Sequence, residues 1–330
     1  MIDVQTYSEK FEEEWDSFIE QKARNSTFLH TRKFLRHNPK NQELDSSLIF
    51  FKNSNIICVL PAVLQRIDER NIFNSHAYST YGGFVVSDKV GVEEAIEIVD
   101  LTIQYAEGKS ADEIIIRNPF RIFNHTPTDE TDYAMWLRGF NLLRRDVEIA
   151  LPLIGFNVQT IDSLYDGKTR NAVRKAEKEN IEVKVTKDFS EYWNILAENL
   201  SERHEAKPTH TLEQFQFLES LVGDEKIKLF GAYYNDKLIA GIVLFVTNKR
   251  AVHAQYIAGL RDFQHLRPIN LLIHQISIWA VENGFQFFNL GMSTNPDGSG
   301  VNSGLCKFKE GFGGRSILRE TMNLVLTRNE

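Results

Sequence analysis

The stretch IKLFGAYYNDKLIAGIVLFVT, residues 227–247, decides the fold. Two runs rich in β-branched and aromatic residues flank Asn235 and Asp236, and these two residue types tolerate the left-handed backbone of a tight turn. The stretch therefore predicts a β-hairpin. A second stretch, LIFFKNSNIICVLPAVL at residues 48–64, predicts another hairpin with its turn at residues 53–55.

Each hairpin is followed by the same series of predicted elements. A further strand is expected at residues 76–86 in the first half and at residues 250–260 in the second. Apolar residues at i, i+3, i+4 and i+7 then predict helices over residues 92–106 and 269–280. Each helix leads into a short apolar strand, EIIIRNP or FQFFNLG. The series thus occurs twice, offset by roughly 175 residues.

This repetition predicts an α+β chain of two tandem copies of one unit. Each copy is expected to be a mostly antiparallel sheet flanked by helices. The join falls near residues 151–160, which places the two domains at residues 1–152 and 153–330. The alternative is one large domain in which the repetition is a coincidence.

Composition excludes several classes of protein. The chain has 330 residues with 42% hydrophobic and 25% charged residues, and its net charge of -7 argues against a nucleic-acid footprint over the whole surface. The sequence predicts no signal peptide and no transmembrane segment, so we expect a cytoplasmic protein. Cys58 and Cys306 are the two cysteines, which excludes a disulfide scaffold or a cysteine zinc site, and no other metal-ligand spacing is present.

The second copy begins with a basic segment, DGKTRNAVRKAEKEN. Arg170, Arg174 and Lys178 form a row at i, i+4 and i+8 of a predicted helix, beside a narrow apolar stripe. Guanidinium groups in such a row suit the phosphates of a nucleotide-linked precursor or a cofactor diphosphate. The alternative is a solvated helix face. A strand and two further helices follow, the second with a capping box at Thr211 and Gln214.

In GLCKFKEGFGG, residues 304–314, Lys307 and Lys309 flank Phe308 and are followed by Gly311, Gly313 and Gly314, a short distance after the apolar run FQFFNLG. Amide formation from an ester or thioester passes through a tetrahedral oxyanion, which a fixed cation stabilises. Lys309 is therefore a catalytic candidate, or a ligand for the phosphates of a donor. Phe308 is expected to pack beneath a base or sugar, and the glycines to let the backbone turn tightly. A solvated surface loop is the alternative.

Other candidates come from single features. YSTYGG is interpreted as a substrate groove exposing tyrosines, or as a strand that ends in a glycine bulge. His204 and His210 flank Pro208, and either can accept a proton from an attacking ammonium. His253 lies mid-strand and is expected in the core. The substrate-binding candidates named from such features are Tyr78, Tyr81, Gly82, Gly83, His210 and Asn289, the last at a strand end.

Together these motifs resemble the tandem acyltransferase-fold proteins of the FemABX type, and still more closely the BioF2-like acyltransferase-domain proteins often found among polysaccharide genes. The matching residues are Arg170, Arg174, Lys175, Ala176 and Lys178, then Tyr81, Gly82 and Gly83, then Phe308, Lys309, Phe312 and Gly313. The resemblance implies two GNAT-like domains and transfer of an acyl or aminoacyl group to an amine of a cell-envelope or polysaccharide precursor. It places the Phe308-Lys309 pair on the donor side.

The sequence differs from these families in the segments that would bind the acyl or aminoacyl donor. A GNAT domain cradles the coenzyme A diphosphate with a glycine turn before its central helix, but here the segment is GLRDFQHLRPINLL. Arg261 and Arg267, with Arg170, are candidates to replace those backbone amides as cofactor-binding residues. About 50 residues separate the basic helix from the next sheet, too few for the long helical arm with which many FemABX ligases bind tRNA.

We therefore expect no tightly bound cofactor and favour an acyl-CoA co-substrate over an aminoacyl-tRNA. Two alternatives stay open. One is a FemABX-type aminoacyl-tRNA-dependent peptidyltransferase of peptidoglycan bridge formation. The other is a non-catalytic protein of the same fold that holds a sugar-nucleotide or peptide. The sequence leaves the acceptor, the acyl chain and the oligomeric state open.

Overall fold

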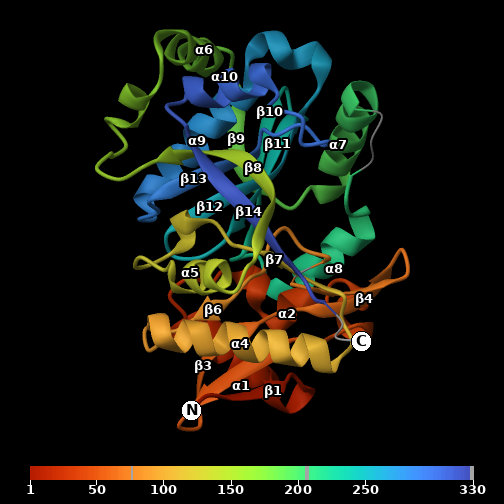
Figure 1. The fold of residues 1–330 in the computed structure, drawn as a ribbon. Helices are drawn as coiled ribbons and strands as arrows, with labels where there is room; N and C mark the ends of the chain where they lie inside the picture. The colour runs from red at the N-terminus through yellow and green to blue at the C-terminus, as the bar shows by residue number, and fades with distance from the viewer. Residues whose placement is uncertain (76, 205–207, 328–330) are drawn as a thin grey trace. The chain divides into compact units, whose positions relative to one another are not determined.

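The computed structural model describes residues 1–75, 77–204 and 208–327, which form two compact units (Figure 1). The first unit contains Met1–Asp146 and Leu318–Glu330, and the second contains Val147–Ile317. The division predicted from the sequence, 1–152 and 153–330, differs from these units chiefly in the C-terminal segment.

The first unit contains two groups of paired strands within its described residues. In spatial order, the first group is β1 (Asp3–Thr6), β2 (Leu48–Lys52), β3 (Asn55–Leu60) and β6 (Val85–Val86). The second group is β4 (Val63–Ile67), β5 (Arg70–Asn74), β7 (Glu113–Arg117) and β14 (Arg315–Val325). The predicted hairpin of β2 and β3 is confirmed, and its turn has φ of 51° at Asn53 and 59° at Ser54.

Helices cover both faces of the β2–β3 hairpin. Leu48 and Phe50 of β2 join the core beneath α4 (Val92–Gly108), whereas Ile49 between them packs with the apolar face of α1 (Glu12–Gln21). Side chains of a strand alternate between the two faces of the sheet, so one strand contributes to two cores.

The second unit is built on one mixed group of strands. Their spatial order is β8 (Asn141–Pro152), β13 (Phe287–Met292), β12 (Ala251–Gly259), β11 (Lys237–Val246), β10 (Ile227–Tyr234) and β9 (Glu182–Thr186). Ile242 packs in the core with α9 (Pro268–Glu282), and the neighbouring Gly241 lies against Tyr192 of α7 (Phe189–His204). The two helices therefore cover opposite faces.

Each unit contains a parallel pair of strands joined through its long helix. In the first unit β5 and β7 pair in parallel around α4, and in the second unit β12 and β13 pair in parallel around α9. Parallel neighbours require such a crossover, whereas antiparallel neighbours need only a turn. The predicted α+β class with two similar tandem units is confirmed.

One predicted element and one of the alternatives are wrong. The sequence predicts a strand at residues 76–86, but within the described residues 77–86 the strand is Val85–Val86, because Gly83 turns the chain with a φ of 81°. The surface-loop alternative for residues 304–314 is wrong, since most of these residues form α10 (Ser303–Gly311). The sequence reading also missed β5, β8 and β14.

Five further α-helices lie within the described residues. They are α2 (Arg32–Leu35), α3 (Pro39–Glu43), α5 (Glu130–Leu137), α6 (Gly167–Glu177) and α8 (Leu212–Val222). Among the described residues, no helix combines the length and apolar character needed to cross a membrane.

Candidate active site

A cavity of about 700 Å³ lies in the second unit, where β12 and β13 diverge. The two strands pair from Ala251 opposite Phe287 to His253 opposite Asn289, and the cavity opens beyond this last pair. Its walls include residues 254, 255 and 257–260 in and just after β12, residues 290–292 at the end of β13, the start of α9 and one side of α10. Diverging strands with helices at both ends form a slot that is open to an elongated ligand.

The β12 wall carries a β-bulge. Val243 of β11 lies opposite Tyr256, but the next residue, Leu244, lies opposite Ala254, so Gln255 is one residue too many for the ladder. A bulge takes backbone groups out of regular pairing and re-aims them, and bulges are frequent next to active sites. Ala254 and Gln255 both line the cavity, so the bulge forms part of its wall.

The mouth of the cavity includes the N-terminus of α9. Arg267 precedes this helix in the left-handed conformation, with φ 63° and ψ 40°, and Pro268 is the first helical residue. Arg267, Ile269 and Asn270 line the cavity. A helix N-terminus presents unpaired N–H groups and partial positive charge, which suits an anion such as a diphosphate. Of the predicted cofactor-binding residues, Arg267 lies at the cavity, whereas Arg261 and Arg170 are not among the residues that line it.

Phe308 and Lys309 of α10 both reach the cavity. Phe308 packs on Phe312 with ring centroids 5.4 Å apart. Lys309 is 3% exposed, and its Nζ donates to the Gly291 carbonyl at 2.7 Å, the Met292 carbonyl at 2.7 Å and the Ser293 hydroxyl at 3.1 Å. Burial lowers the pKa of Lys309 to about 8.

These bonds change the predicted role of Lys309. An ammonium has three N–H donors, and here each has a protein acceptor, so the side chain is committed to the end of β13. The solvated-loop alternative for Lys309 is wrong, because the residue is buried. The glycines that follow it are fixed by packing, since a Cβ at Gly313 would lie 2.6 Å from the Leu164 carbonyl oxygen.

Polar groups in the cavity wall are amides and cations. Among the described lining residues, the charged side chains are those of Arg267 and Lys309, and no carboxylate is present. The apolar part of the wall comes from side chains such as Leu200, Ile257 and Ile273. The site therefore suits a ligand with an apolar body and an anionic end.

The tyrosine-glycine-glycine motif lies in the first unit, and Tyr81 is not exposed there. Tyr81 is 2% exposed, and its hydroxyl donates to Thr27 Oγ1 at 3.0 Å. Gly82 N donates to the Arg117 carbonyl, and a Cβ at Gly83 would meet Pro119 at 3.0 Å. The glycines thus allow close packing against the end of β7. Tyr78 is half-buried, and its hydroxyl donates to Gln65 Oε1.

The predicted Asn289 contact with a ligand is also corrected. Asn289 has no exposed surface, and its Nδ2 donates to Glu148 Oε2 at 2.7 Å while its Oδ1 accepts from Gly291 N at 2.8 Å. His253 lies close by, with its Nδ1 4.0 Å from Glu148 Oε2. The strand-end residue is therefore held inside the unit.

The remaining candidates lie elsewhere in the second unit. His210 is half-buried and shares a hydrogen bond of 2.7 Å with the Tyr256 hydroxyl. Arg174 is exposed and Arg170 partly exposed on α6. His204 is the last residue of α7, and its side chain lies outside the described part of the structure.

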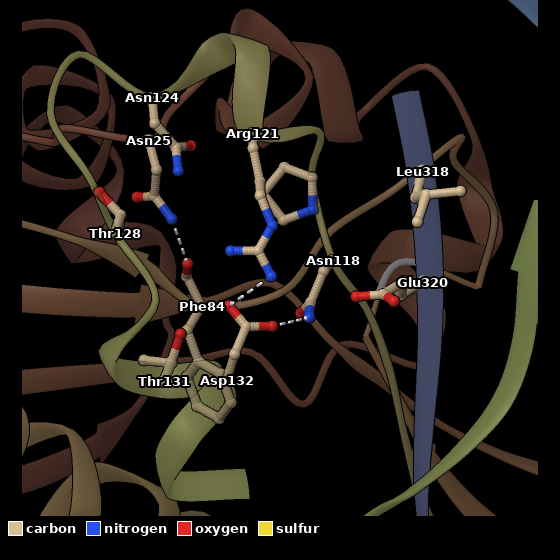
Figure 2. Close-up of a pocket in the computed structure, with 11 residues that line it drawn as sticks. Asn25, Phe84, Asn118, Arg121, Asn124, Thr128, Thr131, Asp132, Leu318 and Glu320 are labelled. Carbon is tan, nitrogen blue, oxygen red and sulfur yellow. Dashed lines mark hydrogen bonds and ion pairs between the residues drawn. The ribbon is translucent and has the colours of Figure 1, made fainter. Parts of the chain in front are cut away.

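A second, much smaller pocket lies in the first unit (Figure 2). Its volume is about 30 Å³, room for little more than water. Asn118 Nδ2 donates to Asp132 Oδ1 at 2.7 Å, and Arg121 Nη2 lies 4.0 Å from Asp132 Oδ2. Figure 2 shows Glu320 of β14 on the other side of Asn118. This polar notch is too small to hold an acyl donor.

Sequence reasoning missed the residues that shape the main cavity. Gln255 gave no signal, because a bulge depends on the register between two strands. Glu148 lies in a strand that the sequence reading did not find. A carboxylate within the apolar run of residues 147–153 was the one available sign, since burying a charge requires a partner.

Residues 166–299 match the acetyltransferase (GNAT) domain family. Together with the two similar units described above, this match defines the class as tandem GNAT-fold proteins and supports an acyltransferase. No curated protein shows significant similarity to the sequence.

Particular solved structures extend the likeness over the whole chain. FemX is similar with a TM-score of 0.73 at 13% identity, over 98% of this chain and 97% of that chain. L-PGS from Bacillus licheniformis is similar with a TM-score of 0.60 at 14% identity, over 96% of this chain and 92% of that chain. A tandem GNAT protein from the clavulanic acid biosynthesis pathway is similar with a TM-score of 0.55 at 6% identity, over 100% of both chains. The predicted resemblance to FemABX-like tandem GNAT proteins is confirmed.

Proposed function

We propose that the chain transfers an uncharged acyl group from a small thioester donor, such as an acyl-CoA, to an amine of a cell-envelope or polysaccharide precursor. The observation that carries this proposal is the cavity of about 700 Å³ between β12 and β13. Its size lies within the range of ligand sites that hold cofactor-sized molecules.

In this proposal the parts of the cavity have separate roles. Arg267 and the N-terminus of α9 hold the diphosphate of the donor, and the apolar walls hold its arm and acyl chain. The acceptor amine attacks the thioester carbonyl, the carbon–sulfur bond breaks, and the thiolate leaves with the proton that the amine loses. We assign the developing oxyanion to the irregular backbone at Gln255, because the three N–H groups of Lys309 already have protein acceptors.

The charges of the wall favour an acyl group over an aminoacyl group. An aminoacyl group carries an ammonium, and its burial requires a carboxylate or several acceptors. The charged side chains among the described lining residues are Arg267 and Lys309, both of the same sign as that ammonium. Like charges in a site of low polarity repel strongly, so the cavity disfavours an aminoacyl donor.

A second candidate is transfer from aminoacyl-tRNA, and α6 is the observation that favours it. Lys168, Arg174, Lys175 and Lys178 are all exposed along or beside this helix. A basic helix face is able to contact several phosphates of an RNA backbone.

Two binding experiments separate the candidates. Calorimetry with acetyl-CoA and longer acyl-CoAs is expected to give saturable heat. Filter binding of mixed aminoacyl-tRNA is expected to be weak at about 50 mM salt and lost at about 200 mM. Tight tRNA binding at the higher salt, with no heat from any acyl-CoA, would contradict the proposal. Saturable acyl-CoA binding without transfer to any tested amine would favour the non-catalytic alternative.

A further inference from the structure

Four polar side chains from four different elements meet beside the cavity. They are Glu148 of β8, His253 of β12, Asn289 of β13 and Lys309 of α10. Glu148 is 2% exposed, Asn289 is 0% and Lys309 is 3%. Burial of charged groups is costly unless they are paired and hydrogen-bonded, so such a cluster requires a compensating role.

Three of the four side chains, those of Glu148, Asn289 and Lys309, are linked by hydrogen bonds through the backbone of Gly291, whereas His253 Nδ1 lies 4.0 Å from Glu148 Oε2. Glu148 Oε2 accepts from Asn289 Nδ2 at 2.7 Å, and Asn289 Oδ1 accepts from Gly291 N at 2.8 Å. The carbonyl of Gly291 then accepts from Lys309 Nζ at 2.7 Å, and Lys309 also donates to the Met292 carbonyl. A carboxylate and an ammonium are thus connected through the backbone of one strand.

That backbone is irregular and forms a wall of the cavity. Between Asn289 and Met292, β13 carries one residue more than β8 opposite it, and Gly291 has a φ of 79°. Leu290, Gly291 and Met292 all line the cavity. A bulge leaves carbonyls outside the ladder, and an ammonium is the side-chain group that can donate to three acceptors from one point.

We infer that Glu148 and Asn289 are positioning residues for acyl transfer: through the Lys309 ammonium they fix the β13 bulge in the shape that the acyl donor contacts. The inference rests on the proposed function for its catalytic meaning, but the network itself can be tested without any donor. In this assignment Lys309 acts through the strand and not on the oxyanion.

The titratable groups around Lys309 set the sign of the expected effect. The charge of Glu148 raises the pKa of Lys309, although burial is the larger influence and lowers it to about 8. Cys306, on the same helix, also faces Lys309, and His253 lies beside Glu148. Removal of the Glu148 charge should therefore lower the pKa of Lys309 further.

The first test uses the protein without ligand. Lysine side chains labelled with ¹³C are titrated by NMR, and the Lys309 signal is assigned by its loss in Lys309→Met. Glu148→Gln keeps the size of the side chain and an acceptor for Asn289, and it should lower the pKa of Lys309 by about 1. Glu310→Gln, an exposed neighbour on α10, is the matched control and should change nothing. An unchanged pKa in Glu148→Gln would overturn the inference.

A second variant covers the case in which Glu148→Gln does not fold. Asn289→Ser keeps the Glu148 charge but shortens the link to Gly291. Hydrogen exchange at the Gly291 amide should become at least about tenfold faster, because the amide loses its side-chain acceptor. Exchange at the wild-type rate would show that the network does not hold the bulge.

The catalytic part has its own readout. If the wild type transfers acyl groups from acetyl-CoA, the alkaline limb of the kcat/KM profile of Glu148→Gln should move down by about one pH unit, and Glu148→Asp should restore most of it. An unchanged pH profile of kcat/KM would contradict a role of the network in acyl transfer and leave it a role in stability alone. Absence of any acetyl-CoA binding by the wild type would contradict the proposed function, and the NMR titration would still decide the inference.

Discussion

At the scale of single residues, close packing explains why a glycine is needed at position 313, just after α10. Gly313 has a φ of 79°, and a Cβ there would lie 2.6 Å from the Leu164 carbonyl oxygen. Gly284 has a similar φ of 76°, with no atom within 4 Å of its Cβ position. The two positions therefore share the same backbone strain but differ in crowding.

This pair gives a matched stability prediction. Gly284→Ala should cost about 1 kcal/mol, the penalty for a left-handed alanine. Gly313→Ala should cost at least about 2 kcal/mol more, because Leu164 must move as well. Urea unfolding of both variants measures the difference. Equal losses would show that Leu164 yields without cost.

Lys309 predicts a dependence of stability on pH. Its ordinary pKa is 10.5, and burial lowers it to about 8 in the folded protein. Below pH 8 both states carry the proton and the folded state bears the full cost of the buried charge. Between about pH 8 and 10.5 the unfolded state binds more protons, so the contribution of Lys309 to the free energy of unfolding should rise with pH, by about 3 kcal/mol at most.

The measurement is a difference between two proteins, because other groups also titrate in this range. The free energy of unfolding of the wild type minus that of Lys309→Met should increase between pH 8 and 10.5. A flat difference would mean that the folded protein keeps the Lys309 ammonium at its ordinary pKa, and a falling one that folding raises this pKa; either result would contradict the prediction.

At the scale of secondary-structure elements, sequence patterns worked wherever the signal was local. The turn residues Asn235 and Asp236 adopt φ of 50° and 61°, and Thr211 accepts from Gln214 N at 3.2 Å in the predicted capping box. The strand prediction for residues 76–86 was wrong because the backbone at Gly83 depends on its packing against Pro119, a contact between residues far apart in the sequence. The site residues Glu148 and Gln255 were missed for the same reason, since register and burial are not local.

The helix α6 gives a prediction that separates its two roles. Arg170 and Arg174 are not among the residues that line the cavity. The double variant Arg170→Gln, Arg174→Gln should therefore bind acetyl-CoA with the wild-type affinity in calorimetry. Binding of tRNA at low salt, where detectable, should weaken and show a smaller dependence on salt. Weaker acetyl-CoA binding by this variant would return α6 to the donor site.

The part of the cavity wall that α10 forms gives a further prediction, about binding of the acyl donor. Leu305 lines the cavity and is 37% exposed, so a larger side chain is tolerated there by the fold. Leu305→Trp should narrow the slot and weaken acetyl-CoA binding by about tenfold or more, with an unchanged melting temperature. Thr131→Val in the small pocket of the first unit is the control and should leave this affinity unchanged. Equal affinities for both variants would move the donor out of the cavity.

At the scale of the whole molecule, the two units share an arrangement of elements but differ in what they enclose. The cavity described in the second unit has a volume of about 700 Å³, and the pocket shown in Figure 2 for the first unit has a volume of about 30 Å³. The repeat was legible in the sequence because hairpins and long helices have strong periodic patterns. The difference in cavities was not, because it arises from how far two strands diverge.

The first unit should depend on the C-terminal segment. Apolar β7 pairs with β5 on one edge and with β14 on the other. A fragment of residues 1–146 lacks β14, so it should expose that edge and aggregate. Addition of a peptide of residues 318–327 should increase the soluble fraction, measured by sedimentation, and a scrambled peptide should not. A monomeric, cooperatively melting fragment would show that β14 is dispensable.

The pairing of β7 with β14 also sets an order of events at the ribosome. The β14 residues of the first unit, from Leu318 onward, are synthesised after the whole of the second unit. The N-terminal half therefore cannot complete its sheet while the chain is growing, and the second unit can finish first. We therefore expect the first unit to be synthesised first and to complete its sheet last. A nascent chain that stalls before residue 315 leaves one edge of β7 unpaired and accessible to chaperones.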